Sequence, residues 1–411
     1  MKLKKQFEDF YKEITIDTEV EDLKEKREVL EKDFKNNFPT ECGKHDIEVR
    51  KSDIEVFDQG SYKLHTTIKN NHGGSIDRDV AVMFTLDISK NNDPKKIKGY
   101  GRDAIKLWNR TTTIKEPCLN VSYVENGTEW MHIDLPLYAK HNGSVYLARG
   151  KEFAAEGNYS WELADPKGLN DYLLERINGN AQLRRIIRYI KKWKLEKYYN
   201  STLDHEVPPS IGLTLLACDC FVASTSSEGD DDLTSLQKTI QNIANKFSLT
   251  YENGVIVKAD ISRYLPVTPW TDVFKKMKDT SDTYGVRFYN RLNTALQNLT
   301  DACNEESEHD AGVSVQKVFG DEFKVPPKQV NASCSCYLFL SRNTREILST
   351  ICRILFPKHA GASPRGLTHM FSKESNKKSN TWILTSIISL SPQNLICCSG
   401  RTPALPYPSY E

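Results

Sequence analysis

The stretch DRDVAVMFTLDI, residues 77–88, decides the fold class of this 411-residue chain. Two acidic residues precede an apolar run, as at the start of a buried strand. Alternating patterns of the same kind occur in IEVFDQGS at 54–61 and TEWMHIDLPLYA at 128–139. Gly, Asn and Asp bound these patterns, which is typical of strands. We therefore expect an α+β domain with a mixed sheet over residues 1–165.

Helical periodicity dominates the segments on either side of this region. Residues 1–40 repeat apolar side chains at helical spacing between many Lys and Glu, which predicts a long N-terminal helix. A further helix is expected at 102–109. Residues 166–327 contain several helical stretches, one of which enters through Pro-Pro-Ser at 208–210. This predicts an all-helical second domain.

Residues 328–411 differ in composition from the rest of the chain. They hold three of the 55 acidic residues and five of the ten cysteines, and no periodic pattern persists in them. We expect an irregular tail. It is either an appended partner-binding segment or an out-of-frame or degenerate end.

The overall composition excludes several classes of protein. With 38% apolar and 27% charged residues the chain is globular, and a net charge of +1 gives no general attraction to nucleic acid or membranes. No apolar run reaches the ~18 residues that a membrane-spanning helix needs. The N-terminus lacks the apolar region of a secretory signal. We expect a cytoplasmic protein with reduced cysteines and no membrane partner.

One ordered set of residues carries chemistry. Gly60-Ser61 ends the first strand pattern, and Asp77 and Asp79 open the second. Residues two apart in a strand point to the same face, so the two carboxylates lie side by side. Asp134, within the third pattern, can complete a cluster of three on a neighbouring strand. Gly60-Ser61 offers a close backbone approach and hydrogen-bond donors to a phosphate.

This cluster suits metal-assisted phosphoryl chemistry. Carboxylate oxygens are the ligands that Mg²⁺ prefers, together with substrate phosphates. Two such ions ~3.5–4 Å apart can activate an attacking hydroxyl and stabilise leaving pyrophosphate. We expect Asp77, Asp79 and Asp134 to be catalytic and to bind two Mg²⁺ ions, which Mn²⁺ can replace.

Taken together, GSYKLHTTIK, DRDVAVMF and HIDLPLYA resemble the polymerase-β-type nucleotidyltransferases. More narrowly, they resemble the bacterial cGAS/DncV-like nucleotidyltransferases of CBASS anti-phage systems. The resemblance extends over residues 1–327, through FGDEF at 319–323. It implies a nucleotidyltransferase core with a spine helix, packed on a helical lobe of the oligoadenylate-synthase type.

The helical part adds two candidate phosphate contacts through the same resemblance. RYIKKWK at 188–194 is similar to a family helix that supplies a lysine, which here is Lys191. PPSIGLTLLA at 208–217 is similar to a helix entry that supplies a serine, here Ser210. A lysine and a helix N-terminus together suit an anion. Trp193 is expected to pack in the core.

The resemblance implies a template-independent enzyme that joins ATP or GTP into a cyclic di- or trinucleotide. Its implied partners are NTP substrates, a downstream effector protein and CBASS accessory proteins, with no DNA template. Three alternatives stay open. The chain could transfer a nucleotide to a protein, a tRNA or a small molecule. It could be a silent nucleotide-binding scaffold, or an RNA-sensing oligoadenylate synthase, which would need a local basic groove.

Overall fold

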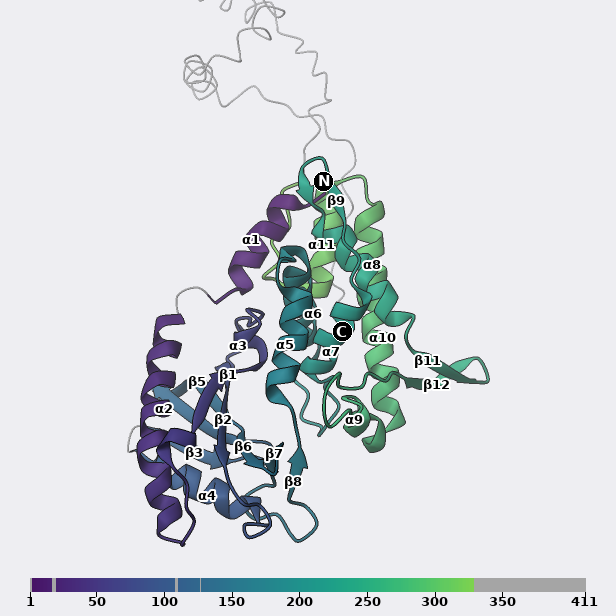
Figure 1. Cartoon of the computed structure of the whole chain (residues 1–411). Coiled ribbons are helices and arrows are strands. Elements are labelled where there is room, and N and C mark those ends of the chain that lie inside the picture. The colour runs from purple at the N-terminus through teal and green to yellow at the C-terminus, as the bar shows by residue number, and fades with distance from the viewer. Residues whose placement is uncertain (1, 17–19, 108–109, 126, 329–411) are drawn as a thin grey trace, which may run out of the picture. The chain divides into compact units, whose positions relative to one another are not determined.

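The computed structural model describes residues 2–16, 20–107, 110–125 and 127–328. Residues 1–329 form one compact unit. Apart from Lys328, the predicted tail lies outside the described residues. Figure 1 shows strands β1–β8 grouped with helices α2 and α4, and helices α5–α11 grouped with α1.

An eight-stranded mixed sheet lies at the centre of the first group, which confirms the predicted sheet. Its strands follow the order β3-β4-β5-β2-β6-β7-β8, and β1 pairs with β2. The bounds are β1 Glu55–Asp58, β2 Ile76–Thr85, β3 Thr111–Ile114, β4 Leu119–Glu125, β5 Thr128–Leu135, β6 Leu137–His141, β7 Ser144–Arg149 and β8 Ser160–Leu163.

Strands β5 and β6 are two halves of one line of chain that is interrupted at Pro136. Both halves run parallel to β2 in the same register, with Asp79 opposite Asp134 and Val82 opposite Leu137. Proline has no N–H to donate, but its carbonyl still accepts a hydrogen bond from Val82 N at 3.1 Å. Strand β5, which carries Asp134, therefore stays aligned with β2, as does the more buried strand β6.

The N-terminal segment forms two helices instead of the single one expected. They are α1 Lys4–Ile14 and α2 Val20–Gly43, and Thr15 at the end of α1 has extended backbone angles. Thr15 and Ile16 are β-branched and favour extended backbone, which explains why α1 ends at Ile14. Phe7 and Phe10 belong to the helical core, whereas Phe34 and Phe38 belong to the core of the sheet.

A second expected helix begins earlier than predicted. Helix α4 runs from Pro94 to Ala104, not over 102–109. The Asp93 side chain accepts a hydrogen bond from Lys95 N at 2.9 Å, and proline takes the first helical position. These are the usual signals of a helix start, and they lie within NNDPKK at 91–96.

The second group is helical apart from two hairpins, so the prediction of an all-helical part was wrong in this detail. The helices are α5 Pro166–Ile177, α6 Ala181–Tyr198, α7 Ser210–Cys220, α8 Asp232–Ala244, α9 Lys275–Thr280, α10 Asp282–Asn304 and α11 Glu308–Phe319. The hairpins pair β9 Thr225–Ser226 with β10 Gly229–Asp230, and β11 Ser248–Glu252 with β12 Val255–Asp260.

Helix α6 is the central element of this group. Trp193 is fully buried and packs against Phe288, as the sequence predicted, with ring centroids 6.2 Å apart.

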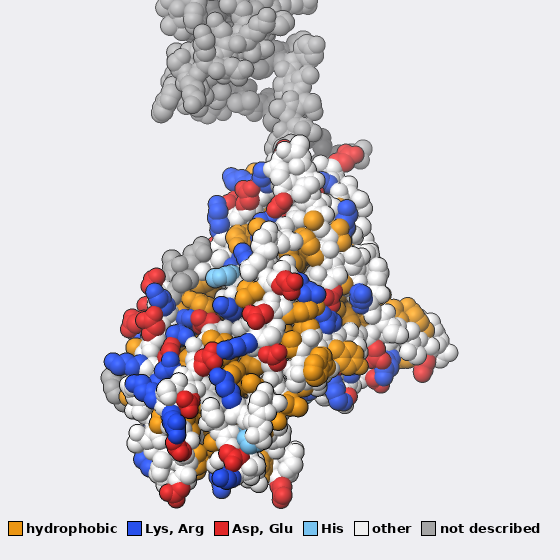
Figure 2. Space-filling model, viewed as in Figure 1, with side chains coloured by type: hydrophobic (Ala, Val, Ile, Leu, Met, Phe, Trp, Pro, Cys, Tyr) orange, Lys and Arg blue, Asp and Glu red, His pale blue; other side chains and the backbone are white. Residues whose placement is uncertain are grey.

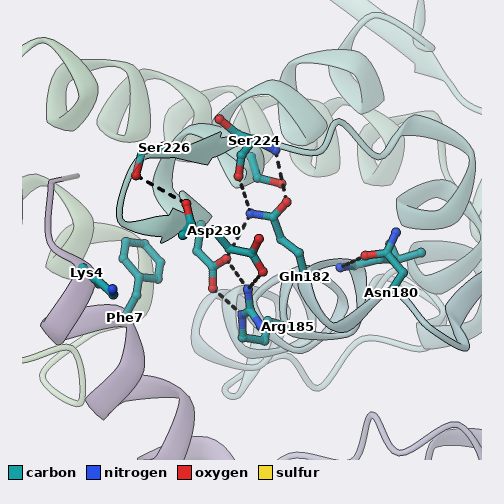
Figure 3. A network of polar contacts seen from close by, with 12 residues as sticks. Lys4, Phe7, Asn180, Gln182, Arg185, Ser224, Ser226 and Asp230 are labelled. Atoms are coloured by element: carbon teal, nitrogen blue, oxygen red, sulfur yellow. Dashed lines mark hydrogen bonds and ion pairs between the residues drawn. The ribbon is translucent and has the colours of Figure 1, made fainter.

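Figure 3 shows how the first turns of α6 hold the β9–β10 hairpin. Arg185 donates to Asp230 and Asp232 at 2.7 Å, and Gln182 donates to Ser224 O at 2.8 Å. These contacts fix the start of α6.

Two further observations concern the whole described part of the chain. Within it, no helix is both long and apolar enough to cross a bilayer. Its cysteines are free thiols: Cys42, Cys118, Cys218, Cys220 and Cys303.

Candidate active site

The three predicted carboxylates lie together on one face of the sheet. In the parallel pairing of β2 with β5, Asp77 stands opposite His132, and Asp79 stands opposite Asp134. Ligand atoms of Asp77, His132 and Asp134 all lie within 4.8 Å of one another. Asn120 on β4 donates to Asp134 Oδ1 at 2.6 Å and so orients that carboxylate.

Arg78 points to the opposite face, as the alternation of a strand requires. Its side chain is buried, and it donates to Asp58 Oδ1 at 2.8 Å and to Leu23 O at 2.6 Å. The guanidinium also lies 3.7 Å from the centroid of the Tyr62 ring. Arg78 thus ties α2 and β1 to the strand that carries both carboxylates.

Gly60 approaches the cluster so closely that no side chain fits there. Its φ is +61°, and a Cβ added to it would lie 2.1 Å from Asp79 Oδ2. Ser61 follows in the short helix α3 Gly60–Lys63, and its hydroxyl lies 3.2 Å from Thr67 Oγ1. The predicted Gly60-Ser61 step therefore borders the carboxylates directly.

The carboxylate of Asp79 is repelled by neighbouring negative charges. Burial raises its pKa above the ordinary range, and the neighbouring carboxylates of Asp77 and Asp134 raise it further. A hydrogen bond to Asp77 raises the pKa of His132. Such a cluster is stabilised by a cation, because a cation relieves the mutual repulsion of the carboxylates.

Lysines from α6 lie beside the carboxylates. Lys191 is buried and donates to Thr66 O and Oγ1, both at 3.1 Å, and Thr66 N donates to Ser61 O at 2.8 Å. The predicted residues Lys191 and Ser61 are thus joined through one threonine. Asp79 and Asp77 both act electrostatically on Lys191.

Ser210 is linked to this group by a lysine that the sequence analysis did not single out. Lys194 Nζ donates to Ser210 Oγ at 2.5 Å, at the first residue of α7. The negative charge of Asp77 also acts on Lys194 and favours its protonated form. The available signal was spacing, because Lys194 follows Lys191 by three residues and falls on the same helical face.

The electrostatics of this lysine pair are unusual. Burial and the charge of Lys194 lower the pKa of Lys191 to about 7. Burial lowers the pKa of Lys194 to about 8. Neither lysine forms a direct ion pair with a carboxylate of the described residues, and two adjacent amines of this kind suit a polyanionic ligand such as a triphosphate.

Comparisons with known proteins find relatives of the part of the chain that carries this cluster. Residues 54–138 match the family model described as the nucleotidyltransferase domain of cyclic GMP-AMP synthase DncV-like proteins. These residues thus resemble a DncV-like nucleotidyltransferase domain. The resemblance to the cGAS/DncV-like nucleotidyltransferases is thereby confirmed. The matched range contains Gly60, Ser61 and all three carboxylates.

A relative and two solved structures are similar to the chain that carries this DncV-like domain. A cyclic GMP-AMP synthase of Escherichia albertii is 26% identical over 196 residues, or 43% of this chain and 41% of that protein. The alignment thus spans less than half of that relative. Vibrio cholerae DncV with a linear intermediate has a TM-score of 0.58 at 16% identity, covering 77% of this chain and 96% of that one. Escherichia coli DncV bound to 3'-deoxy GTP has a TM-score of 0.55 at 14% identity, with 76% and 93% covered.

The lysine pair beside the DncV-like domain predicts a pH-dependent affinity for nucleoside triphosphate. As the pH rises from 7 to 9, Lys191 and then Lys194 lose their protons, so the attraction for phosphate falls. We expect the affinity for a non-hydrolysable ATP analogue to drop about ten-fold or more, since one pKa unit corresponds to a factor of ten. Calorimetry at several pH values measures this. Saturating Ca²⁺ keeps the carboxylates ionised throughout.

The control for this prediction is Lys194→Arg. Its guanidinium stays charged over the whole range, so the decline should be shallower than in the unmodified protein. Equal slopes in the two proteins, or a flat profile in both, would contradict the assignment of the lysines as phosphate ligands.

Proposed function

We propose that this chain is a template-independent nucleotidyltransferase. It joins nucleoside triphosphates, with ATP and GTP as the expected substrates, into a cyclic di- or trinucleotide and releases pyrophosphate. The observation that carries the proposal is the register that sets Asp79 opposite Asp134, two residues along the strand from Asp77 and beside Lys191. The similarity to cyclic GMP-AMP synthases supports the cyclic product.

In this proposal the chain's own residues bind and orient the donor. Gly60 and Ser61 approach the phosphates from the sheet, and Lys191 approaches them from α6. The Lys194–Ser210 pair lies at the α7 entry, where two donors can take the far end of a triphosphate. All five groups stand at defined places of the backbone: the end of a strand, one face of a helix and the start of another helix.

The three carboxylates fit divalent ions, because they are hard ligands that repel one another when no cation is bound. Bound Mg²⁺ or Mn²⁺ would stabilise the charge that develops on the attacking and leaving oxygens. Asp77 and Asp79 would hold these ions, and Asp134 would complete the set.

The transfer itself is a displacement at the α-phosphorus. A ribose hydroxyl oxygen of the acceptor forms the new P–O bond, and the bond to the β-phosphate bridging oxygen breaks, so pyrophosphate leaves. Asp134 lies where it can accept the hydroxyl proton, and Asn120 fixes its orientation. A second transfer by the same residues closes the ring, or a third if the product is a trinucleotide. We propose that the product signals to an effector protein in anti-phage defence.

Product analysis tests the proposal. Purified full-length protein is incubated with four radiolabelled NTPs and Mg²⁺ or Mn²⁺, treated with phosphatase and separated by thin-layer chromatography. We expect a phosphatase-resistant product that the Asp77→Ala/Asp79→Ala variant does not make. Omitting one NTP at a time identifies the bases. Label on added tRNA, on protein or on a small acceptor would instead establish the transferase alternative.

A failure to form any product would favour a silent scaffold, which still binds a nucleotide in calorimetry. A linear oligoadenylate made only with added RNA would favour the RNA-sensing alternative. On the face shown in Figure 2, Lys and Arg are interspersed with Asp and Glu rather than gathered into one basic stripe. Binding of long RNA usually requires such a stripe.

A further inference from the structure

His132 occupies the fourth position of a square that the three carboxylates leave open. In the register of β2 with β5, Asp77 pairs with His132 just as Asp79 pairs with Asp134. Residues two apart in a strand share a face, so all four side chains project from the same side of the sheet. His132 is therefore as much a member of the cluster as the aspartates.

The two ring nitrogens of His132 have different surroundings. Nε2 lies 3.2 Å from Asp77 Oδ1, on the side of the carboxylates. Nδ1 lies 2.6 Å from Ser75 Oγ, and Ser75 in turn donates to Glu129 Oε1 at 2.7 Å. Since the Ser75 hydroxyl hydrogen is used toward Glu129, its oxygen accepts from Nδ1–H. The other nitrogen, Nε2, donates its hydrogen to the Asp77 carboxylate, and a cation bound there would take the place of that proton.

A histidine held in this way has the outer hydrogen bonds that usually orient a metal ligand. Metal-binding histidines typically donate their other ring N–H to a polar group, which fixes the tautomer and the ring orientation. Ser75 and Glu129 supply that support here. Ligand atoms of Asp77, His132 and Asp134 also lie within the 4.8 Å span that one ion can bridge.

We propose that His132 Nε2 is a ligand of the divalent ion held by Asp77 and Asp134, and that it makes this site prefer Mn²⁺ to Mg²⁺. The inference rests on the proposed nucleotidyltransferase site. Mg²⁺ favours oxygen ligands and retains its waters. A first-row transition ion takes an imidazole nitrogen more readily, and Mn²⁺ also accepts carboxylates.

Pulsed EPR of Mn²⁺ tests the ligand directly. Mn²⁺ alone is added to the full chain, without nucleotide, and the electron spin echo is examined for modulation by a directly bound ¹⁴N nucleus. We expect this modulation in the unmodified protein and its loss in His132→Gln. Calorimetry of His132→Gln should show that its Mn²⁺ affinity is about ten-fold or more below that of the unmodified protein, whereas its Mg²⁺ affinity is roughly unchanged.

His141→Gln is the matched control. It removes an imidazole that lies 3.6 Å from the carboxylate of Asp87, beyond the other end of β2. This variant should keep both the nitrogen signal and the Mn²⁺ affinity. Gln at position 132 can still hydrogen-bond to Asp77, so a purely structural role for His132 would leave the metal preference in place.

Three results would overturn the inference. The first is Mn²⁺ bound to the unmodified protein with no ¹⁴N modulation, and the second is modulation that persists in His132→Gln. The third is an equal loss of Mn²⁺ and Mg²⁺ affinity in His132→Gln, which would make His132 a positioning residue for Asp77. Because no nucleotide is present, these results are independent of the product assay. A missing cyclic product with an intact nitrogen signal would refute only the proposed function.

Discussion

Asp79→Asn should abolish nucleotidyl transfer and, in the metal-free protein, raise the free energy of unfolding. The loss of a metal-binding carboxylate removes several kcal/mol of transition-state stabilisation, which corresponds to a fall of ~1,000-fold or more in product formation. The gain in stability arises because Asn carries no charge beside Asp77 and Asp134. Product formation and thermal unfolding in EDTA measure the two effects.

The pH dependence of that stability has a definite sign. The folded state raises the pKa of Asp79, so between the unfolded value of ~4 and the raised value only the folded protein keeps the proton. The stability contribution of Asp79 therefore falls as the pH rises through this window. The difference between Asp79→Asn and the unmodified protein should be largest near pH 8 and should vanish near pH 4.

Asp87→Asn is the matched control, since Asp87 follows the other end of β2 and hydrogen-bonds to Ser89. It should keep its transfer activity and show no gain in stability at pH 8. Asp79→Asn protein that still makes product at more than a tenth of the original rate would contradict the assignment of Asp79 as a metal ligand.

Glu322→Leu should cause a large loss of stability although it lies outside the site. Lys192 is fully buried in α6, and its Nζ lies 2.6 Å from Glu322 Oε1. Removing the carboxylate leaves a buried ammonium without a counter-ion, which lowers the free energy of unfolding by ~3–5 kcal/mol. Chemical denaturation followed by tryptophan fluorescence measures the change.

The double variant Lys192→Met/Glu322→Leu separates charge from packing. Buried ion pairs are often replaced by apolar side chains without loss, so the double variant should regain most of the stability. If it is as unstable as Glu322→Leu, then the loss comes from the packing of 319–323 against its neighbours and not from the unpaired charge.

The carboxylates were predictable because strand alternation is a local property. Asp77 and Asp79 share a face whatever the rest of the fold does, and the apolar residues around Asp134 indicate a strand. The pairing of β2 with β5 depends on long-range register, which the alternation alone does not give. The position of His132 beside Asp77 follows only from that register.

The cationic part of the site was harder to predict. Lys191 was selected through a family resemblance, and the sequence does not reveal that it is buried and bonded to Thr66. Lys194 was missed although its three-residue spacing from Lys191 places it on the same helical face, because this helix carries many other basic residues. Its contact with Ser210 depends on how α7 packs against α6.

The secondary structure was predicted wrongly where tertiary contacts or helix capping determine which element forms. The prediction of a helix at 102–109 overlooked the Asp93-Pro94 start, which is a local signal. The short hairpin β9–β10 has almost no strand pattern of its own, and its two-residue strands are held by Arg185 and Gln182 of α6.

The split of the N-terminal segment has a mechanical consequence. Ile14 of α1 belongs to the helical core, whereas Ile16 and α2 belong to the core of the sheet, so the chain passes from one core to the other at Thr15. Leu64, between β1 and β2, belongs to the helical core again, and the chain passes over once more between β8 and α5. The two cores are therefore connected at several points along the chain. Such connections hinder rotation of one core against the other, which keeps Lys191 beside the same carboxylates in every turnover.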